Sequence, residues 1–402
     1  MDDSPRGRAT VSSLLAKGVR IPNPGSLDID DDVDASRIAA HGVVLHAGTR
    51  LRGARTVISA GCVLGAEGPV TVENCALGER VELKGGYFAE SVFLDRANLG
   101  LGAHVRAGSL LEEESGGAHC VGLKQTILFP FATLGSLINF CDCLLSGGTS
   151  RSDHSEVGSS YIHFNFTPDG DKTTASLFGD VPRGVMLDQP PIFLGGQGGA
   201  VGPVVTGFGT VVGAGSILRG DVPDDGQLVL EGVHRDLRRP RARESYRGLR
   251  RIVERNVDYL ASLVALDAWY RSARRPFFDR AEFGPQIFAA ALDALASGRA
   301  ERAKRLTAMI AKVPLGDDPG RRQLAARAAE LAGLFAPTDA PAPASLTGAL
   351  SDAAASGTGY VDAVRGLDAS AKADGTAWLA AIVDQLRSAS ATLAPDLGLF
   401  TA

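Results

Sequence analysis

The sequence is poor in cysteine, in net charge and in long apolar runs, and each scarcity excludes a class of protein. The five cysteines are an odd number and no secretory signal follows Met1, so a disulfide-linked secreted domain is not expected and a cytoplasmic location is. No run reaches the ~18 apolar residues of a membrane span. The formal net charge of −5, from 41 basic and 46 acidic residues, argues against a nucleic-acid partner.

Glycine, in contrast, is abundant and unevenly distributed. Residues 38–225 hold 32 of the 49 glycines, whereas residues 241–402 hold 12 glycines and 39 alanines. Glycine marks turns, whereas alanine, with the leucine and arginine that accompany it, favours helix. The composition therefore predicts two architectures that meet near Pro240, preceded by an N-terminal arm or cap over residues 1–37.

Within the glycine-rich part, aliphatic residues recur at every sixth position. The four series run from Leu45 to Val63, Leu99 to Leu111, Leu128 to Phe140 and Val205 to Ile217. A period of six fits neither an amphipathic helix nor a strand with alternating faces, which disfavours an ordinary β-sandwich. It fits a three-sided coil in which one aliphatic residue per side points inward. We therefore expect a β-helix over residues 38–225, with loops, bulged coils or departures near 66–98, 112–126 and 146–200.

Residues 226–402 are expected to form an α-helical domain. Apolar residues follow helical spacing from Leu249 to Ala268, from Ile287 to Leu295 and from Leu306 to Val313. Residues 336–345 are typical of a Pro/Ala linker. We expect at least four helices here, packed on the coil or on partner chains. Nine arginines between residues 235 and 255 are predicted to form a hinge and a helix face paired with acidic groups, rather than a nucleotide, membrane or RNA site.

Polar residues gather between residues 139 and 197, and motifs follow one another in a fixed order up to residue 222. The order comprises Ser152-Asp153-His154, then Asn165-Phe166 with Lys172-Thr173, then Pro203-Val204, then Gly213-Ala214-Gly215. In this order the motifs resemble the left-handed parallel β-helix acyltransferases with hexapeptide repeats. The resemblance is strongest to the acetyltransferase half of the bifunctional N-acetylglucosamine-1-phosphate uridyltransferase / glucosamine-1-phosphate N-acetyltransferases, and it covers residues 128–222.

The resemblance implies a homotrimer that transfers an acetyl group from acetyl-CoA to the amine of an amino-sugar phosphate or nucleotide sugar, a step related to UDP-N-acetylglucosamine biosynthesis. No metal is expected. The uridyltransferase half has no counterpart before the coils, so nucleotidyl transfer is not expected. The alternative is a non-catalytic β-helix that binds a sugar nucleotide or scaffolds a partner enzyme, with the helices as a docking module.

The resemblance also implies a role for His154 as the general base. An imidazole, with an ordinary pKa of about 6.5, can take a proton from an amine at neutral pH. The alternative is a turn histidine hydrogen-bonded to Asp153 or Glu156. The acyl donor would contact Gly196 and Ala214, where small side chains let a pantetheine arm approach the backbone, although both residues are also ordinary in a hexapeptide repeat.

Four further residues are predicted to bind the acceptor: Asn165, Lys172, His163 and Arg151. The alternatives are that Asn165 belongs to an asparagine ladder, that Lys172 is a solvated loop charge and that His163 fills the core.

The chain departs from the family pattern where the acceptor would be bound. Phe166 stands in place of the family's tyrosine, and Phe129-Pro130 and Cys141 stand near the family's phosphate-binding arginine and lysine. Lys124 or Arg151 could replace the lost charge. The acceptor therefore need not be glucosamine 1-phosphate.

Overall fold

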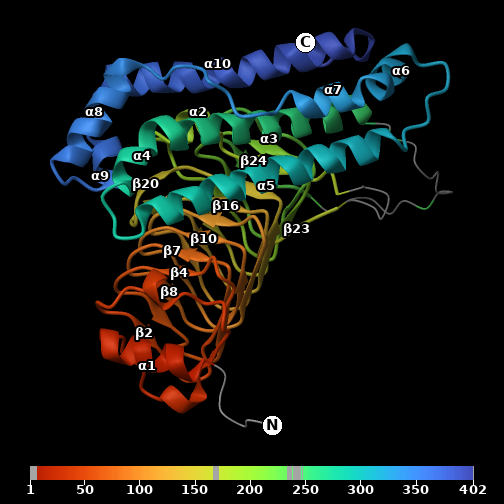
Figure 1. Ribbon diagram of the computed structural model, residues 1–402. Helices are drawn as coiled ribbons and strands as arrows, with labels where there is room; N and C mark the ends of the chain where they lie inside the picture. Colours follow the sequence, from red (N-terminus) through yellow and green to blue (C-terminus); the bar gives the residue numbers. More distant parts are fainter. Residues whose placement is uncertain (1–6, 166–171, 233–237, 239–245, 247, 402) are drawn as a thin grey trace.

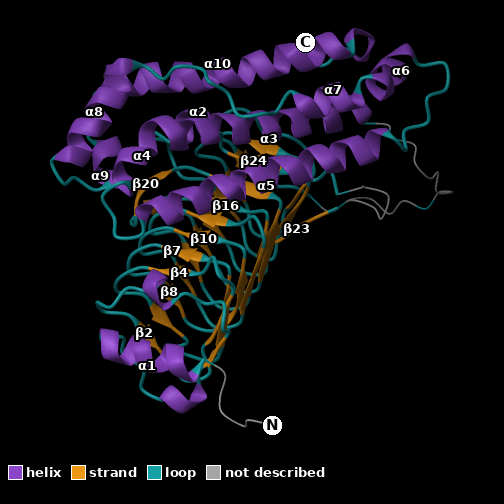
Figure 2. Cartoon of the chain, viewed as in Figure 1, coloured by secondary structure: helices purple, strands orange, loops and turns teal. Residues whose placement is uncertain are grey.

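The computed structural model describes residues 7–165, 172–232, 238, 246 and 248–401. It contains a parallel β-helix that carries helices along one side and at its C-terminal end (Figure 1). Figure 2 shows the same division, with stacked strands in the lower half and helices gathered over them. The predicted parallel β-helix followed by a helical region is confirmed. No helix in the described part of the chain is long and apolar enough to cross a membrane.

The strands of the coil form three parallel sheets, named A, B and C because each turn from β2 onward passes through them in that order. The strands of sheet A are β2 (Val44–Leu45), β5 (Val63–Leu64), β8 (Glu82–Leu83), β11 (Asn98–Leu99), β14 (Gly116–Gly117), β17 (Thr133–Leu134), β22 (Glu156–Val157), β25 (Phe193–Leu194), β28 (Val211–Val212) and β30 (Leu228–Val229). Those of sheet B are β1 (Asp28–Ile29), β3 (Arg50–Arg52), β6 (Val70–Glu73), β9 (Gly86–Ala89), β12 (Ala103–Arg106), β15 (Val121–Lys124), β18 (Ile138–Cys141), β23 (Ile162–Phe164), β26 (Gly199–Val201) and β29 (Ile217–Leu218). Those of sheet C are β4 (Val57–Ile58), β7 (Ala76–Leu77), β10 (Val92–Phe93), β13 (Leu110–Leu111), β16 (Ile127–Leu128), β19 (Cys143–Leu145), β24 (Ser176–Phe178) and β27 (Val205–Thr206). Strands β1 and β30 lie outside the predicted limits of 38–225.

Each short strand turns one side chain toward the axis of the coil, and the strand register stacks these side chains into columns. The inward column of sheet B is buried throughout and consists of Leu51, Val72, Phe88, Val105, Leu123, Phe140, His163, Ala200 and Leu218. Burying one aliphatic side chain stabilises a fold by about 1.5–3 kcal/mol. Contacts between neighbouring turns therefore hold the coil together.

The six-residue period is correct, but its phase is wrong by one residue at Val57 and Val63 of the first series and in the last series. Val212 and Leu218 are buried, whereas Val211 is 40% exposed and Ile217 is half-buried. Both positions of each strand are aliphatic, so hydrophobicity does not distinguish them. The strand pleat decides which residue faces inward.

The coil is more regular than the spacing predicts. Successive partners in sheet A lie 19, 19, 16, 18, 17, 23, 37, 18 and 17 residues apart. At 66–98 and 112–126 the coil continues without an inserted loop, and turns of unequal length break the six-residue spacing there. Insertions lie only in the two longest turns, within the predicted stretch 146–200.

Sheet C is apolar on both faces, and the helices cover its outer face. Seven residues form its outward row and are at most 5% exposed: Val57, Ala76, Val92, Leu110, Ile127, Leu144 and Leu177. Helix α5 (Gly284–Ile310) contacts β7 and β10, and α3 (Leu249–Trp269) contacts β24. Without these helices, the outward row of sheet C would expose a large apolar patch to water.

Further helices lie beyond α3 and α5, on the side away from the coil or beside it (Figure 1). They are α4 (Arg275–Phe278), α6 (Pro319–Ala326), α7 (Ala328–Gly333), α8 (Ala344–Ala355), α9 (Tyr360–Arg365) and α10 (Ala369–Leu393). A π-helical turn (Tyr270–Arg274) joins α3 to α4. Helix α10 packs on α3 and on the short helix α2 (Val181–Gly184), and α1 (Arg8–Lys17) packs on β1 at the other end of the coil. The prediction of at least four helices is confirmed.

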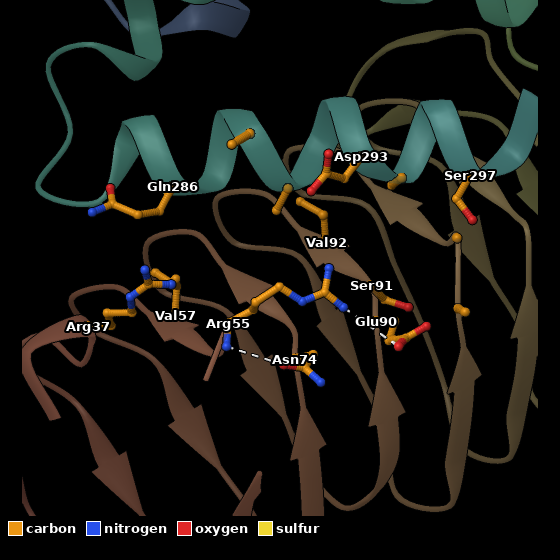
Figure 3. Close-up of a pocket in the computed structure, with 15 residues that line it drawn as sticks. Arg37, Arg55, Val57, Asn74, Glu90, Ser91, Val92, Gln286, Asp293 and Ser297 are labelled. Atoms are coloured by element: carbon orange, nitrogen blue, oxygen red, sulfur yellow. Dashed lines mark hydrogen bonds and ion pairs between the residues drawn. The ribbon is translucent and has the colours of Figure 1, made fainter. Parts of the chain in front are cut away.

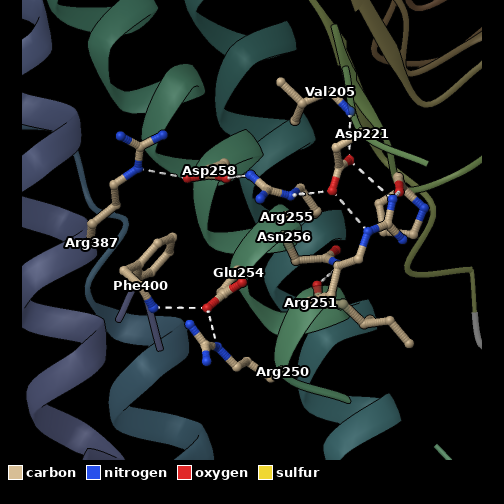
Figure 4. Close-up of polar contacts among 12 residues, drawn as sticks. Val205, Asp221, Arg250, Arg251, Glu254, Arg255, Asn256, Asp258, Arg387 and Phe400 are labelled. Carbon is tan, nitrogen blue, oxygen red and sulfur yellow. Dashed lines mark hydrogen bonds and ion pairs between the residues drawn. The ribbon is translucent and has the colours of Figure 1, made fainter. Parts of the chain in front are cut away.

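Arginines at the start of α3 connect the last turn of the coil to α10 (Figure 4). Arg251 and Arg255 both donate to Asp221, at 2.8 and 3.2 Å, and Arg255 also pairs with Asp258. Arg387 of α10 donates to Asp258 at 2.7 Å. The predicted pairing of the arginine cluster with acidic groups is confirmed for these two members. Arg235, Arg239, Arg241, Arg243, Arg247 and Pro240 lie outside the described residues.

Candidate functional site

A β-hairpin carries His154 at the corner where the chain passes from sheet C to sheet A. Strands β20 (Gly148–Ser150) and β21 (Asp153–His154) pair antiparallel between β19 and β22. Gly148 has a φ of +96°, and a Cβ on it would lie 2.6 Å from the Cα of His154. Only glycine fits this turn without strain.

The half-buried His154 has a defined tautomer when it is neutral. Its Nδ1 lies 2.8 Å from the carbonyl oxygen of Arg151, and a carbonyl oxygen can only accept a hydrogen bond. Nδ1 therefore carries the proton, and Nε2 is the basic nitrogen. The contact with Arg151 fixes the orientation of the imidazole ring on the hairpin. The alternative partners Asp153 and Glu156 do not make this contact.

Arg151 fastens the tip of the hairpin to earlier turns of the coil. Its Nη1 donates to the carbonyl oxygens of Glu114 and Phe131 and to Oγ1 of Thr133, at 2.9–3.0 Å. All three acceptors are uncharged, so the positive charge of the exposed Arg151 remains available to an anion.

His163 lies in the inward column of sheet B, beside Phe140 and Phe178. It is 5% exposed, and its Nε2 is 2.8 Å from Oγ of Ser176. Burial lowers the pKa of His163 to about 4, because a charged imidazole would lose its hydration. His163 therefore fills the core, as the alternative interpretation of the sequence has it. Its burial does not fit the predicted contact with a sugar.

Asn165 and Lys172 are exposed at the ends of a segment inserted at the corner between sheets B and C. Residues 166–171, with Phe166, lie outside the described part. The carbonyl oxygen of Lys172 accepts a hydrogen bond from Nη1 of Arg302 at 2.9 Å. Arg302 is a buried residue of α5 that also pairs with Asp142 at 3.0 Å. The helical region therefore fixes one end of this inserted segment.

Gly196 and Ala214 lie on neighbouring turns at the corner between sheets A and B. The carbonyl oxygen of Gly196 accepts a hydrogen bond from the N–H of Gly215 at 2.9 Å. A Cβ on Gly196 would lie 2.7 Å from the carbonyl oxygen of Ser159. Close stacking of turns thus accounts for this glycine, while Ala214 is exposed.

The three groups of predicted residues lie at three different corners of the coil. His154 and Arg151 lie at the C–A corner, Asn165 and Lys172 at the B–C corner, and the acyl-donor pair at the A–B corner. One chain does not bring the imidazole, the amide and the ammonium group around a single groove. A site that contains them all needs corners of more than one chain.

Sequence reasoning missed a buried ion cluster between the coil and the helices. Arg274 is paired with Glu112 at 2.8 Å and with Glu113, and its guanidinium lies 3.7 Å from the centre of the Tyr360 ring. The hydroxyl of Tyr270 donates to Glu112 at 2.6 Å. Burial raises the pKa of Glu112 to about 7. The signal was the acidic run 112–114, which interrupts the aliphatic repeat.

Two cavities lie between the coil and the helices. One, of about 280 Å³, is roofed by α5 (Figure 3). Gln286 and Asp293 of the helix line it on one side, and Arg55, Asn74 and Glu90 on successive turns of the coil line it on the other. Arg55 lies 3.6 Å from Glu90. The other, of about 500 Å³, lies at the C–A corner and includes Arg151. Among the described residues, no group of three or more His, Cys, Asp or Glu could hold a metal ion.

Comparison with known proteins identifies relatives of the coil. No protein-family model matches the chain. It is 27% identical over 230 residues to the bifunctional protein GlmU of Mycolicibacterium smegmatis, a match of 57% of this chain and 42% of the relative. It is 28% identical over 221 residues to the GlmU of Trichlorobacter lovleyi, covering 55% and 42%. The GlmU of Thermotoga petrophila is 26% identical over 214 residues, covering 53% and 42%.

The chain spans about two fifths of the length of these curated relatives. The matches and the parallel β-helix together confirm the predicted resemblance to the hexapeptide-repeat acyltransferase class. The resemblance extends beyond residues 128–222, because the aligned stretch of 230 residues is longer than the coil itself.

Proposed function

We propose that the chain transfers an acetyl group from acetyl-CoA to the amine of an amino-sugar phosphate or nucleotide sugar. The observation that carries this proposal is the hairpin that presents His154 on a coil of this class with its Nε2 as the basic nitrogen. In the proposed reaction the amine nitrogen attacks the thioester carbon while Nε2 accepts the amine proton. Backbone N–H groups stabilise the oxyanion. The C–S bond then breaks, and the leaving thiolate takes the proton from His154.

The separation of the predicted residues supports a site built between chains of a homotrimer. Outward side chains of sheet B such as His104 and Asn139 are exposed. The large apolar side chains Leu101, Leu137 and Ile162 are 41–56% exposed on this face or at the adjoining A–B corner. Burial of such side chains at an interface stabilises an oligomer. Sedimentation equilibrium should give three times the chain mass of 41.7 kDa. A mass of one chain would contradict the trimer.

The second candidate is a non-catalytic β-helix that binds a sugar nucleotide or scaffolds an enzyme. The observation that favours it is the loss of the family's phosphate-binding cations, since Phe129 is fully buried in their place and Cys141 is half-buried. In this case the chain releases no thiol from acetyl-CoA with any acceptor.

A thiol-release assay distinguishes the two candidates. We expect the native chain to release CoA in the presence of at least one member of a panel of amino-sugar phosphates and nucleotide amino sugars. His154→Ala should lower kcat by about 10²–10⁴-fold with a small effect on KM, because the base acts on the transition state. His41→Ala, which removes an exposed histidine near the N-terminal end of the coil, is the matched control. Equal activity of native chain and His154→Ala would refute the assignment.

A further inference from the structure

The larger cavity is built jointly by the coil and by the helical region. Its coil side consists of four successive C–A corners, at residues 94–96, 113–114, 131 and 150–151. Its other side consists of α4, the segment 357–359 and α9. A volume of about 500 Å³ lies within the range of about 300–1,000 Å³ that holds small-molecule ligands.

Five arginines and four acidic residues line this cavity. Arg96 is neutralised by Glu114 at 2.7 Å, and Arg274 by the buried glutamates described above. In contrast, the side chains of Arg280 and Arg365 make no hydrogen bond or ion pair with any part of the chain that the structure describes. Arg151 donates only to uncharged oxygens.

Three arginines without an acidic partner therefore face two remaining carboxylates of the lining, Asp95 and Asp362. Guanidinium groups that line one cavity can bind phosphate oxygens there, often through two parallel hydrogen bonds.

Aromatic side chains supply the apolar part of the lining. Phe277 and Tyr360 pack edge to face with ring centres 5.5 Å apart, and Phe131 contributes a further ring from the coil. Aromatic surface beside arginines is suited to a ligand that carries both a ring and a phosphate.

We propose that this cavity binds a phosphate-bearing sugar or nucleoside, with the phosphate between Arg151, Arg280 and Arg365 and the ring against the aromatic wall. The helical region then supplies two of the three cations, Arg280 and Arg365, and the hairpin of the coil supplies Arg151. The site is distinct from the imidazole of His154, and binding there does not depend on acyl transfer.

Isothermal titration calorimetry on the full chain tests the proposal with inorganic pyrophosphate, UDP, glucosamine 1-phosphate and uridine as probes. We expect at least one phosphate-bearing probe to bind, with uridine at least 10-fold weaker than UDP. Arg280→Gln and Arg365→Gln should each weaken phosphate binding at least 10-fold. Arg275→Gln should change phosphate binding by less than 2-fold, because Arg275 is an exposed residue of α4 that does not line the cavity.

Two results would overturn the proposal: no saturable binding of any phosphate probe, or equal loss in all three arginine variants. Thermal melting of each variant checks folding, which should be preserved because Arg280 and Arg365 are exposed. His154→Ala should bind the phosphate probes as the native chain does. Phosphate binding by a native chain that shows no acetyl transfer would refute only the proposed function. Acetyl transfer by the native chain, together with undiminished phosphate binding by Arg280→Gln and Arg365→Gln, would refute only this inference.

Discussion

His163 and His154 show how differently two histidines of one short stretch can be placed. His163 occupies a position in the inward column of sheet B that aliphatic and aromatic residues fill on the other turns. His154 lies on an inserted hairpin, where no coil register applies. The sequence places both residues near the same motif but does not show where the insertion begins, so it left both roles of His163 open.

The buried imidazole of His163 should make the fold sensitive to acid. Its folded pKa of about 4 lies below the unfolded value of about 6.5, so the unfolded chain binds more protons between these values. The free energy of unfolding should therefore fall as the pH falls, by about 2 kcal/mol between pH 7 and pH 4.5 from this group. Urea unfolding at both pH values measures it.

His163→Leu should remove this part of the pH dependence, because leucine has a similar volume and no titrating group. His119→Ala, at an exposed position, should leave the dependence unchanged. An identical fall in stability for the native chain and His163→Leu would show that the buried imidazole is not responsible.

At the scale of elements, the hairpin β20–β21 is the insertion on which the proposed chemistry depends. Gly148→Ala places a methyl group against the backbone at His154 and forces a non-glycine residue to a φ of +96°. We expect a loss of stability of about 2–3 kcal/mol, since strain and overlap both contribute. A fall in acetyl transfer should accompany it, and thermal melting and the thiol-release assay measure the two effects.

Gly226→Ala provides the comparison for this variant. Gly226 also has a positive φ, of +70°, but a Cβ there meets no atom within 4 Å. It should cost only about 1 kcal/mol and leave acetyl transfer intact. Equal losses in both variants would mean that the contact with His154 has no effect of its own.

The six-residue period predicted the inward residues of the coil better than it predicted the lengths of its turns. Aliphatic spacing is a local property, and it identified inward residues such as Leu99, Val105 and Leu111 correctly. Turn length is set by how each corner packs on its neighbours, so the spacing failed where turns have 16 or 19 residues. The doubled apolar residues of strands such as β10 and β13 were the available signal that helices cover sheet C.

At the scale of the whole molecule, the ion cluster around Arg274 couples the helical region to the coil. Its members are separated by about 160 residues in the sequence, so no local pattern could pair them. Arg274→Met leaves the carboxylates of Glu112 and Glu113 without their buried cation. We expect a loss of about 3–5 kcal/mol at pH 8.

The loss should be smaller at pH 6. The pKa of Glu112 is already raised to about 7 with Arg274 present, and removal of the guanidinium raises it further, so the carboxyl is neutral at pH 6 and its burial costs less. Chemical denaturation at both pH values measures the difference. Arg96→Met, which breaks the exposed pair with Glu114, should cost at most about 1 kcal/mol. A loss for Arg274→Met that does not change with pH would exclude the charge explanation.

The unequal turn lengths of the coil have a consequence for how such a protein can diversify. The 23- and 37-residue turns add a hairpin, an inserted segment and helix α2, yet the next turns return to 18 and 17 residues in unbroken register. Each rung is aligned only by the rungs before and after it. Segments at these corners can therefore be exchanged for others of different length and chemistry, and the architecture accepts new specificities without redesign of its core.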